Sequence, residues 1–132
     1  MENIVNFQMR LLENKIAIVT GGSRGIGKAI ARHYSEEGAT VIIADINEKS
    51  GKETADSIGG YFVKTDISDE KCVTSLFEYV KTKFARLDVL VNNAGLLKDS
   101  TLKKMESDQF DAVINVNLRG TYLCGKAAAD MM

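Results

Sequence analysis

The sequence predicts an α/β fold in which a parallel sheet is covered by helices on both faces. Four short apolar runs alternate with segments of helical periodicity. The run 41–44 (Val-Ile-Ile-Ala) is continuously apolar, as is typical of a strand buried on both faces. A glycine-rich turn, residues 20–27, joins the first strand to the first helix. Because parallel strands need long crossovers, this order of elements favours a doubly wound parallel sheet.

The first strand is expected at residues 15–20. The helix after it is expected to run to about residue 37 and to end at Gly38, where a left-handed C-terminal cap suits glycine. One face of this helix is expected to hold Ile26, Ala29, Ile30 and His33.

The second strand is expected at residues 40–45. Asn47 follows it and is expected to cap a helix that runs to about residue 58. A Gly59-Gly60 turn then leads into the third strand, residues 61–65.

Ser68 is expected to cap the next helix. Its apolar positions follow the i, i+3, i+4, i+7 spacing of a buried helix face: Val73, Leu76, Phe77, Val80 and Phe84. The fourth strand is expected at residues 87–92. After a loop, Ser107 is expected to cap a last helix that carries Phe110, Val113, Ile114, Leu118 and Tyr122.

Composition and charge exclude several classes of protein. The chain has 132 residues, 45% of them hydrophobic and 27% charged, which suits one globular domain. The net charge is -1, so neither nucleic acid nor an anionic membrane is expected as a partner. No apolar run reaches the roughly 20 residues that span a bilayer. Glu2 and the lack of an early basic cluster argue against a secretory signal.

The two cysteines predict free thiols. Cys72 and Cys124 share no metal-ligand spacing with each other or with His33, the only histidine, so we expect no metal site and a reducing, cytoplasmic location. Residues 1–14 are expected to form a lead segment, with Leu11 and Leu12 packed under the first strand. Residues 15–132 then form the domain.

The glycine-rich turn predicts a phosphate-binding site. Open parallel sheets bind ligands outside the carboxyl ends of their strands, and this turn follows the first strand. Glycines let the backbone approach an anion closely, and the free N–H groups at a helix start favour negative charge. Residues 22–28 also fit the G-x-x-x-x-G-K pattern of nucleotide hydrolases. Ala29 stands where that pattern needs a Ser or Thr to bind magnesium, which disfavours hydrolysis.

Three motifs together resemble one enzyme family. The turn reads Thr-Gly-x-x-x-Gly-x-Gly, residues 92–95 read Asn-Asn-Ala-Gly, and residues 115–118 read Asn-Val-Asn-Leu. In this order they resemble the short-chain dehydrogenase/reductase family, most closely its 3-oxoacyl-carrier-protein reductases and related hydroxy/keto dehydrogenases. The resemblance runs from about residue 11 to residue 132, the N-terminal half of a typical member. It implies a truncated Rossmann-type sheet with strand order 3-2-1-4.

The resemblance also implies a role for each motif residue. The pyrophosphate and adenosine ribose would be surrounded by Gly21, Ser23, Arg24, Gly25, Ile26 and Gly27. Asp66 and Ile67 would border the adenine. The nicotinamide-side ribose would be lined by Asn93, Ala94 and Gly95. Asn117 matches a catalytic asparagine that helps to hold a water in the proton relay.

Asp45, at the end of the second strand, is expected to favour NAD. A carboxylate there accepts hydrogen bonds from the ribose hydroxyls and repels the 2′-phosphate of NADP. Arg24 acts in the opposite direction, because an arginine beside the glycine turn pairs with that phosphate in NADP-using relatives. We expect the carboxylate to dominate, since like charges at hydrogen-bond range cost several kcal/mol (order of magnitude) in a partly buried site.

Family chemistry needs a serine, a tyrosine and a lysine four residues after the tyrosine, all beyond the asparagine helix. The sequence ends before they would occur. Tyr79 and Lys83 fit Tyr-x-x-x-Lys, but they precede the Asn-Asn-Ala-Gly motif and are expected to be structural.

The lineage therefore implies an oxidoreductase that moves a hydride between NAD(H) and an alcohol, a ketone or an acyl thioester. The chain itself is expected to be a truncated piece that keeps the cofactor site. The alternative is a non-enzymatic binding or interaction fragment, or a non-functional remnant. A homo-oligomer, or self-association through the fourth strand and the last helix, is expected.

Overall fold

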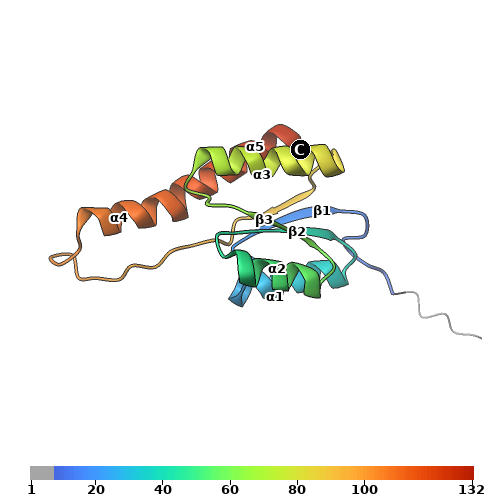
Figure 1. The fold of residues 1–132 in the computed structure, drawn as a ribbon, viewed down its shortest axis with the longest axis horizontal. Coiled ribbons are helices and arrows are strands. Elements are labelled where there is room, and N and C mark those ends of the chain that lie inside the picture. Colours follow the sequence, from blue (N-terminus) through green and yellow to red (C-terminus); the bar gives the residue numbers. More distant parts are fainter. Residues whose placement is uncertain (1–7) are drawn as a thin grey trace, which may run out of the picture.

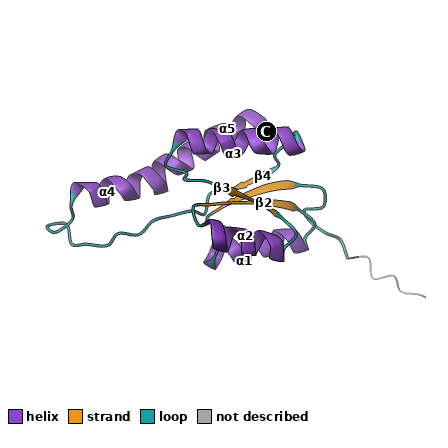
Figure 2. Cartoon of the chain, viewed as in Figure 1, coloured by secondary structure: helices purple, strands orange, loops and turns teal. Residues whose placement is uncertain are grey.

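A four-stranded parallel sheet lies between two layers of helices in the computed structural model, which describes residues 8–132 (Figure 1, Figure 2). The strands run in the order β3-β2-β1-β4. Their bounds are β1 Ile16–Thr20, β2 Thr40–Asp45, β3 Tyr61–Lys64 and β4 Val89–Val91. This confirms the predicted fold class and strand order, with the first, third and fourth strands shorter than predicted.

Helices cover both faces of the sheet. One face carries α1 (Gly25–Glu36) and α2 (Glu48–Ser57), and the other carries α3 (Glu70–Phe84) and α5 (Thr121–Met131) (Figure 1). The chain reaches α5 through α4 (Ser107–Val113) and the π-helical η1 (Ile114–Gly120), so these three elements form one continuous helix. Figure 2 shows α4 and the loop before it extending beyond the sheet.

The core lies on the two faces of β1 and β2, as their alternating side chains require. Ile18 and Ile42 are neighbours in the sheet and are fully buried on the side of α3 and α5. Val19 and Ile43 are also neighbours and are fully buried on the side of α1 and α2. The buried face of α3 is Val73, Leu76, Phe77 and Val80, as predicted, with Phe84 partly buried.

The face of α1 that the sequence predicted to hold Ile26, Ala29, Ile30 and His33 is not the face that the helix buries. The helix buries Gly27 and Ala31, with Ile30 partly buried beside them. Ile26 is 75% exposed, and Ala29 and His33 are exposed as well. The reason is the close approach of Gly27 to the backbone at Gly21, which sets the rotation of the helix. No hydrophobic periodicity encodes that contact.

Of the three predicted N-terminal helix caps, one is confirmed. Oδ1 of Asn47 accepts a hydrogen bond from the Ser50 N–H at 3.1 Å, so Asn47 caps α2. The prediction for Ser68 is wrong, because Asp69 caps α3 by accepting from the Lys71 N–H at 2.9 Å. The Ser68 hydroxyl instead donates to Oδ1 of Asp66 at 2.6 Å.

The prediction for Ser107 is also wrong. Glu106 is the N-cap of α4, and Ser107 is the first helical residue. The Glu106 N–H donates to Oε1 of Gln109 at 3.0 Å, which satisfies a backbone donor that the helix leaves free.

The lead segment packs against the end of α1. The Leu11 and Leu12 N–H groups donate to Glu37, at its carboxylate (2.9 Å) and its carbonyl (3.0 Å) respectively. Leu11 is 73% exposed, so the prediction that it packs under the first strand is wrong. Residues 1–7 of the predicted lead segment lie outside the described residues.

Cys72 and Cys124 are free, as predicted. Burial raises the pKa of the Cys124 thiol to about 11, so this group stays protonated at neutral pH. Across residues 8–132, no helix is both long and apolar enough to cross a membrane. The same residues contain no group of three or more His, Cys, Asp or Glu side chains placed to hold a metal ion.

Candidate functional site

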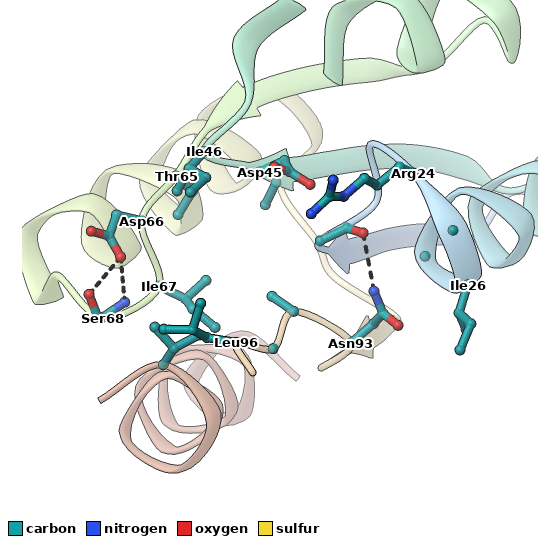
Figure 3. Close-up of a pocket in the computed structure, with 17 residues that line it drawn as sticks. Arg24, Ile26, Asp45, Ile46, Thr65, Asp66, Ile67, Ser68, Asn93 and Leu96 are labelled. Carbon is teal, nitrogen blue, oxygen red and sulfur yellow. Dashed lines mark hydrogen bonds between the residues drawn. The ribbon is translucent and has the colours of Figure 1, made fainter. Parts of the chain in front are cut away.

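A cavity of about 530 Å³ opens at the carboxyl ends of the strands. Figure 3 shows side chains from the glycine-rich turn, from the ends of β2 and β3 and from the loop after β4 arranged around it. Every residue that the sequence predicted to contact cofactor lines this cavity, with the exception of Ser23. The structure therefore brings together residues that are up to about seventy positions apart in the chain.

The sequence reasoning missed six lining residues: Ala44, Ile46, Thr65, Ser68, Leu96 and Val116. Each of them stands next to a predicted site residue in the chain, or next but one. Proximity to a motif at a strand end was the signal that could have found them.

The glycine-rich turn packs tightly where it enters α1. Gly21 has a φ of +64°, and its N–H donates to the Ala44 carbonyl at 2.8 Å. A Cβ atom added at Gly27 would overlap the carbonyl oxygen of Gly21 and would lie 2.5 Å from Nδ2 of Asn93. Glycine at both positions therefore lets the start of α1 lie directly against the end of β1. Gly25, Ile26 and Gly27 of the first helical turn line the cavity, and the free N–H groups at a helix start favour an anion.

Thr20 connects β1 to the loop after β4. Its hydroxyl donates to the Val91 carbonyl at 3.2 Å and accepts from the N–H groups of Asn93 (3.1 Å) and Ala94 (3.0 Å). The Thr20 side chain is fully buried. One hydroxyl thus fixes the backbone of the Asn-Asn-Ala-Gly motif at the cavity wall.

Asn93 strengthens the same junction. Its Nδ2 donates to the carbonyls of Thr20 (3.0 Å) and Gly21 (3.1 Å), and Figure 3 shows the bond to Gly21. The asparagine amide therefore holds the glycine-rich turn against the end of β4. The Asn93 side chain thus fixes the backbone that shapes the cavity, and Ala94 and Gly95 form the wall beside it.

Asp45 presents a carboxylate at the end of β2. Oδ2 accepts from the Ser23 N–H at 3.2 Å, and Oδ1 accepts from the Asn47 N–H at 3.0 Å. The Arg24 side chain extends toward Asp45 across the mouth of the cavity (Figure 3). This corner therefore combines the Asp45 carboxylate, which is fixed by two backbone hydrogen bonds, with the exposed Arg24 guanidinium. Ser23 itself is buried and reaches the cavity only through its bond to Asp45.

Asp66, Ile67 and Ser68 form the opposite wall. Oδ1 of Asp66 accepts from the N–H of Ser68 at 3.0 Å and from its hydroxyl at 2.6 Å, as Figure 3 shows. Ile67 is buried and packs against Gly120 of η1, where a Cβ atom would lie 2.6 Å from its Cδ1. This contact packs η1, the helix that carries Asn117, against the loop that follows β3.

Asn117 does not line the cavity, although its neighbour Val116 does. Its Oδ1 accepts from the Leu96 N–H at 2.7 Å, and its Nδ2 donates to the Leu96 carbonyl at 3.0 Å. The amide thus ties η1 to the loop that follows the Asn-Asn-Ala-Gly motif. An amide oxygen and an amide nitrogen each keep one further hydrogen-bonding position.

Tyr79 and Lys83 lie apart from the cavity. They belong to α3, where the Lys83 ammonium is 5.8 Å from the Tyr79 ring centroid and 4.6 Å from that of Tyr61 on β3. Neither residue lines the cavity. The structure therefore confirms that this Tyr-x-x-x-Lys pair is not at the predicted site.

Comparison with known proteins decides the family. The family model described as short chain dehydrogenase matches residues 15–132. The chain belongs to the short-chain dehydrogenase family. The sequence resemblance is thus confirmed over the whole described domain.

Short-chain dehydrogenase relatives match throughout this chain. A (+)-cis,cis-nepetalactol synthase, NEPS3, from Nepeta racemosa is 43% identical over 138 residues, which cover 100% of this chain and 51% of the relative. The short-chain dehydrogenase reductase ATA1 from Arabidopsis thaliana is 43% identical, over 98% of this chain and 47% of the relative. The chain spans about half the length of the curated relatives it matches.

A solved short-chain dehydrogenase structure has the same fold. The 3-ketoacyl-(acyl-carrier-protein) reductase from Brucella melitensis, complexed with NADH, superposes with a TM-score of 0.88 at 35% sequence identity. The superposition covers 91% of this chain and 51% of that chain. The similarity to an acyl-carrier-protein reductase that the motifs indicated is therefore present in the structure as well.

Proposed function

We propose that this chain forms the NAD-binding part of a short-chain dehydrogenase that transfers a hydride between the cofactor and an alcohol or ketone carbon. The substrate class extends to 3-oxoacyl thioesters, because a 3-ketoacyl reductase with NADH is a close structural neighbour. One observation carries the proposal: the three family motifs converge on one cavity at the strand ends. Two free thiols support a reducing, cytoplasmic location as part of the same proposal.

The cavity fits a dinucleotide by its size and its chemistry. Its volume of about 530 Å³ lies within the usual range of small-molecule sites. The side-chain-free turn at Gly21, Gly25 and Gly27, with Arg24 and Ile26 beside it, suits a pyrophosphate. The half-buried Asp45, held by Ser23, suits the adenosine ribose. Asp66 and Ile67 suit the adenine, which has an apolar face and polar edges.

The other end of the cavity suits the nicotinamide half. Ala94 and Gly95 offer a wall with little side chain, and Asn93 fixes its backbone. NAD supplies hydride chemistry when it is bound. Asn117 is assigned to hold a water for proton transfer through the two amide positions that Leu96 leaves free. That assignment follows the family motif.

Asp45 supports a preference for NAD over NADP. Its two oxygens are held by backbone N–H groups, so the carboxylate stays at the cavity corner where a ribose 2′ substituent would lie. A phosphate there would meet a fixed negative charge. Arg24 offers partial compensation from the exposed side of the mouth.

We expect the Asp45→Asn variant to lose the preference for NAD. Removing the charge should weaken NADH binding about tenfold and narrow the difference between NADH and NADPH, since one charge-assisted hydrogen bond and one repulsion disappear together. Fluorescence titration with each reduced cofactor measures both effects. Asp56→Asn, which removes an exposed charge from α2, the helix that follows β2, is the matched control. An unchanged ratio of the two affinities in the Asp45 variant would contradict the assignment.

We propose that these 132 residues bind NADH without turnover. No serine follows Asn117 in this sequence. The one Tyr-x-x-x-Lys match after it, Tyr122 and Lys126, lies on α5, and neither residue lines the cavity. Positioned acid–base catalysis is worth about 10²–10⁴-fold, so its loss leaves a binder. Titration of NADH by fluorescence tests binding, and ketone-dependent oxidation of NADH tests turnover. Steady turnover by the purified chain would refute this part of the proposal, and the absence of NADH binding would refute the whole.

An exposed apolar row favours a second candidate function, which is interaction with another protein chain. Four side chains spaced four residues apart on α4, η1 and α5 form a helix stripe: Phe110, Ile114, Leu118 and Tyr122. Phe110 is 55% exposed and Leu118 is 64% exposed. The π-helical η1 has more residues per turn than the roughly 3.6 of an α-helix, which keeps positions four apart near one face.

The charges at the two ends of the helix stripe favour a second copy of this chain. Glu106 and Lys126 continue the same four-residue spacing beyond Phe110 and Tyr122, and both are exposed. Two antiparallel copies would pair the phenylalanine of one with the tyrosine of the other, and each glutamate with a lysine. Among residues 8–132, β4 pairs with β1 alone, so its other edge is a further unpaired surface.

We expect Leu118→Glu to prevent self-association. A carboxylate in the middle of the helix stripe would be buried against apolar side chains, which costs several kcal/mol unless it is paired. Sedimentation velocity should show a dimer for the wild type and a monomer for the variant. Ala29→Glu, at an exposed position on α1 over the other face of the sheet, should leave the dimer intact. A wild-type chain that stays monomeric at high concentration would contradict this candidate.

A further inference from the structure

A buried hydroxyl on α2 contacts the glycine-rich turn from behind the cavity. Oγ1 of Thr54 donates to the Ser23 carbonyl at 2.8 Å, across 31 positions of sequence. Thr54 is 2% exposed, and neither residue lines the cavity. The hydroxyl therefore acts on the turn without any access to a ligand.

The bond fixes a peptide plane that does reach the cavity. The Ser23 carbonyl and the Arg24 N–H belong to one trans peptide unit, so they point in opposite directions. With the carbonyl held by Thr54 in the interior, the Arg24 N–H is directed outward. Arg24 lines the cavity, and within residues 8–132 no atom accepts a hydrogen bond from this N–H. It is thus a donor available at the cavity wall.

The preceding peptide is fixed in the same way. The Ser23 N–H donates to Oδ2 of Asp45 at 3.2 Å. Ser23 is accordingly held through its N–H by β2 and through its carbonyl by α2. The two bonds together determine the rotation of the turn between Gly22 and Gly25, where glycines on both sides would otherwise permit alternatives.

We infer that Thr54 is a positioning residue of the dinucleotide site: its hydroxyl holds the Ser23–Arg24 peptide so that the Arg24 N–H is presented to the adenosine half of the cofactor. This inference rests on the proposed function for the identity of the ligand. The orientation of the turn itself rests on the hydrogen bonds alone.

Three variants separate the hydroxyl from the packing of Thr54. Thr54→Val keeps the shape of the side chain and removes the donor, and Thr54→Ser keeps the donor. Ser57→Ala is the matched control, because it removes a hydroxyl of α2 that donates at 2.7 Å to the Thr54 carbonyl within the helix. Should Thr54→Val fail to fold by circular dichroism, Thr54→Ala takes its place in the same measurements.

We expect Thr54→Val to weaken NADH and ADP binding in parallel by about tenfold, the effect of one hydrogen bond of about 1.4 kcal/mol. Thr54→Ser should restore both affinities to within about twofold of the wild type, and Ser57→Ala should leave them unchanged. Equal affinities for Thr54→Val and the wild type, at a temperature where both are folded, would overturn the inference. A purely structural role predicts that equality together with a lower melting temperature.

Hydrogen exchange of the ligand-free chain gives a readout that needs no cofactor. Amides of residues 21–27 should exchange faster in Thr54→Val than in Thr54→Ser or Ser57→Ala. If the wild type binds no NADH but this difference is present, the proposed function fails and the positioning of the turn stands. If NADH binds and the exchange of residues 21–27 is the same in all variants, the positioning inference fails and the proposed function stands.

Discussion

Replacement of Gly27 by alanine is expected to lower the free energy of unfolding by about 3 kcal/mol, at the upper end of the cost of overpacking. The added Cβ atom would overlap the Gly21 carbonyl oxygen and press on Nδ2 of Asn93. Neither neighbour of this Cβ atom can easily move away. One is backbone, and the other is the Asn93 amide, which is held by two hydrogen bonds. Relief requires α1 to move away from β1, which opens the corner proposed to hold the pyrophosphate. NADH binding should therefore be lost along with stability.

Gly125→Ala is the matched control for this prediction. Gly125 lies inside α5, and a Cβ atom there meets nothing within 4 Å. The same substitution should stabilise the chain by roughly 0.5–1 kcal/mol, because alanine has the higher helix propensity. Urea unfolding of both variants measures the pair of effects. If Gly27→Ala proved as stable as the wild type, the close approach of α1 to β1 would not exist in solution.

Much of the fold could be predicted because it depends on local signals. The bounds of β2 follow from one apolar run, and Asn47 caps α2 because its side chain meets an N–H three residues on. The buried face of α3 follows from regular spacing against a flat sheet. In each case the residues that decide the structure are neighbours in the sequence.

The predictions that were wrong have a common physical cause. Competing hydrogen bonds and tertiary contacts decided these positions, and the spacing of residue types in the sequence does not show them. Ser68 could have capped α3, but its hydroxyl has a carboxylate acceptor in Asp66, and Asp69 takes the cap. Ile26 fits an apolar face, yet the approach of Gly27 to Gly21 rotates it into solvent. Tertiary contact decided both.

The candidate site shows the same division. The glycine motif predicted the position of the cavity, because its glycines meet backbone requirements of the turn itself. Gly21 and Gly25 have positive φ angles, and Gly27 lies close to the Gly21 backbone. The support behind the motif was not predictable, since Thr20 meets the loop after β4 more than seventy residues on, and Thr54 meets the turn from α2. No pattern in the sequence predicts the hydrogen-bond partner of a buried threonine hydroxyl.

The comparisons fit the proposal that this region binds a cofactor. A relative named as a nepetalactol synthase and a solved 3-ketoacyl reductase both match this chain over about half their length. Two such different names over one shared half are expected if that half carries the nucleotide-binding geometry. On this argument, substitutions in the cavity should alter cofactor binding rather than the choice of substrate.

Thr20→Val is expected to cost about 3 kcal/mol of stability, because it removes from the interior one hydroxyl that takes part in three hydrogen bonds. Valine matches threonine in shape, so packing in the core is kept and the hydroxyl alone is removed. The Ala94 N–H would lose its acceptor, the Asn93 N–H would keep only the Val91 carbonyl at 3.0 Å, and that carbonyl would lose the Thr20 donor. Urea unfolding measures the loss.

Thr65→Val gives the comparison that isolates the network. Thr65 is also buried, but its hydroxyl makes one local bond, donating to the Val63 carbonyl at 3.0 Å. Its removal should cost about 1 kcal/mol. Equal losses at the two threonines would mean that β4 is held by its strand pairing alone. A larger loss at Thr20 would mean that one hydroxyl on β1 fixes the loop that forms the far wall of the cavity. In that case NADH affinity should fall in Thr20→Val even at temperatures where the chain stays folded.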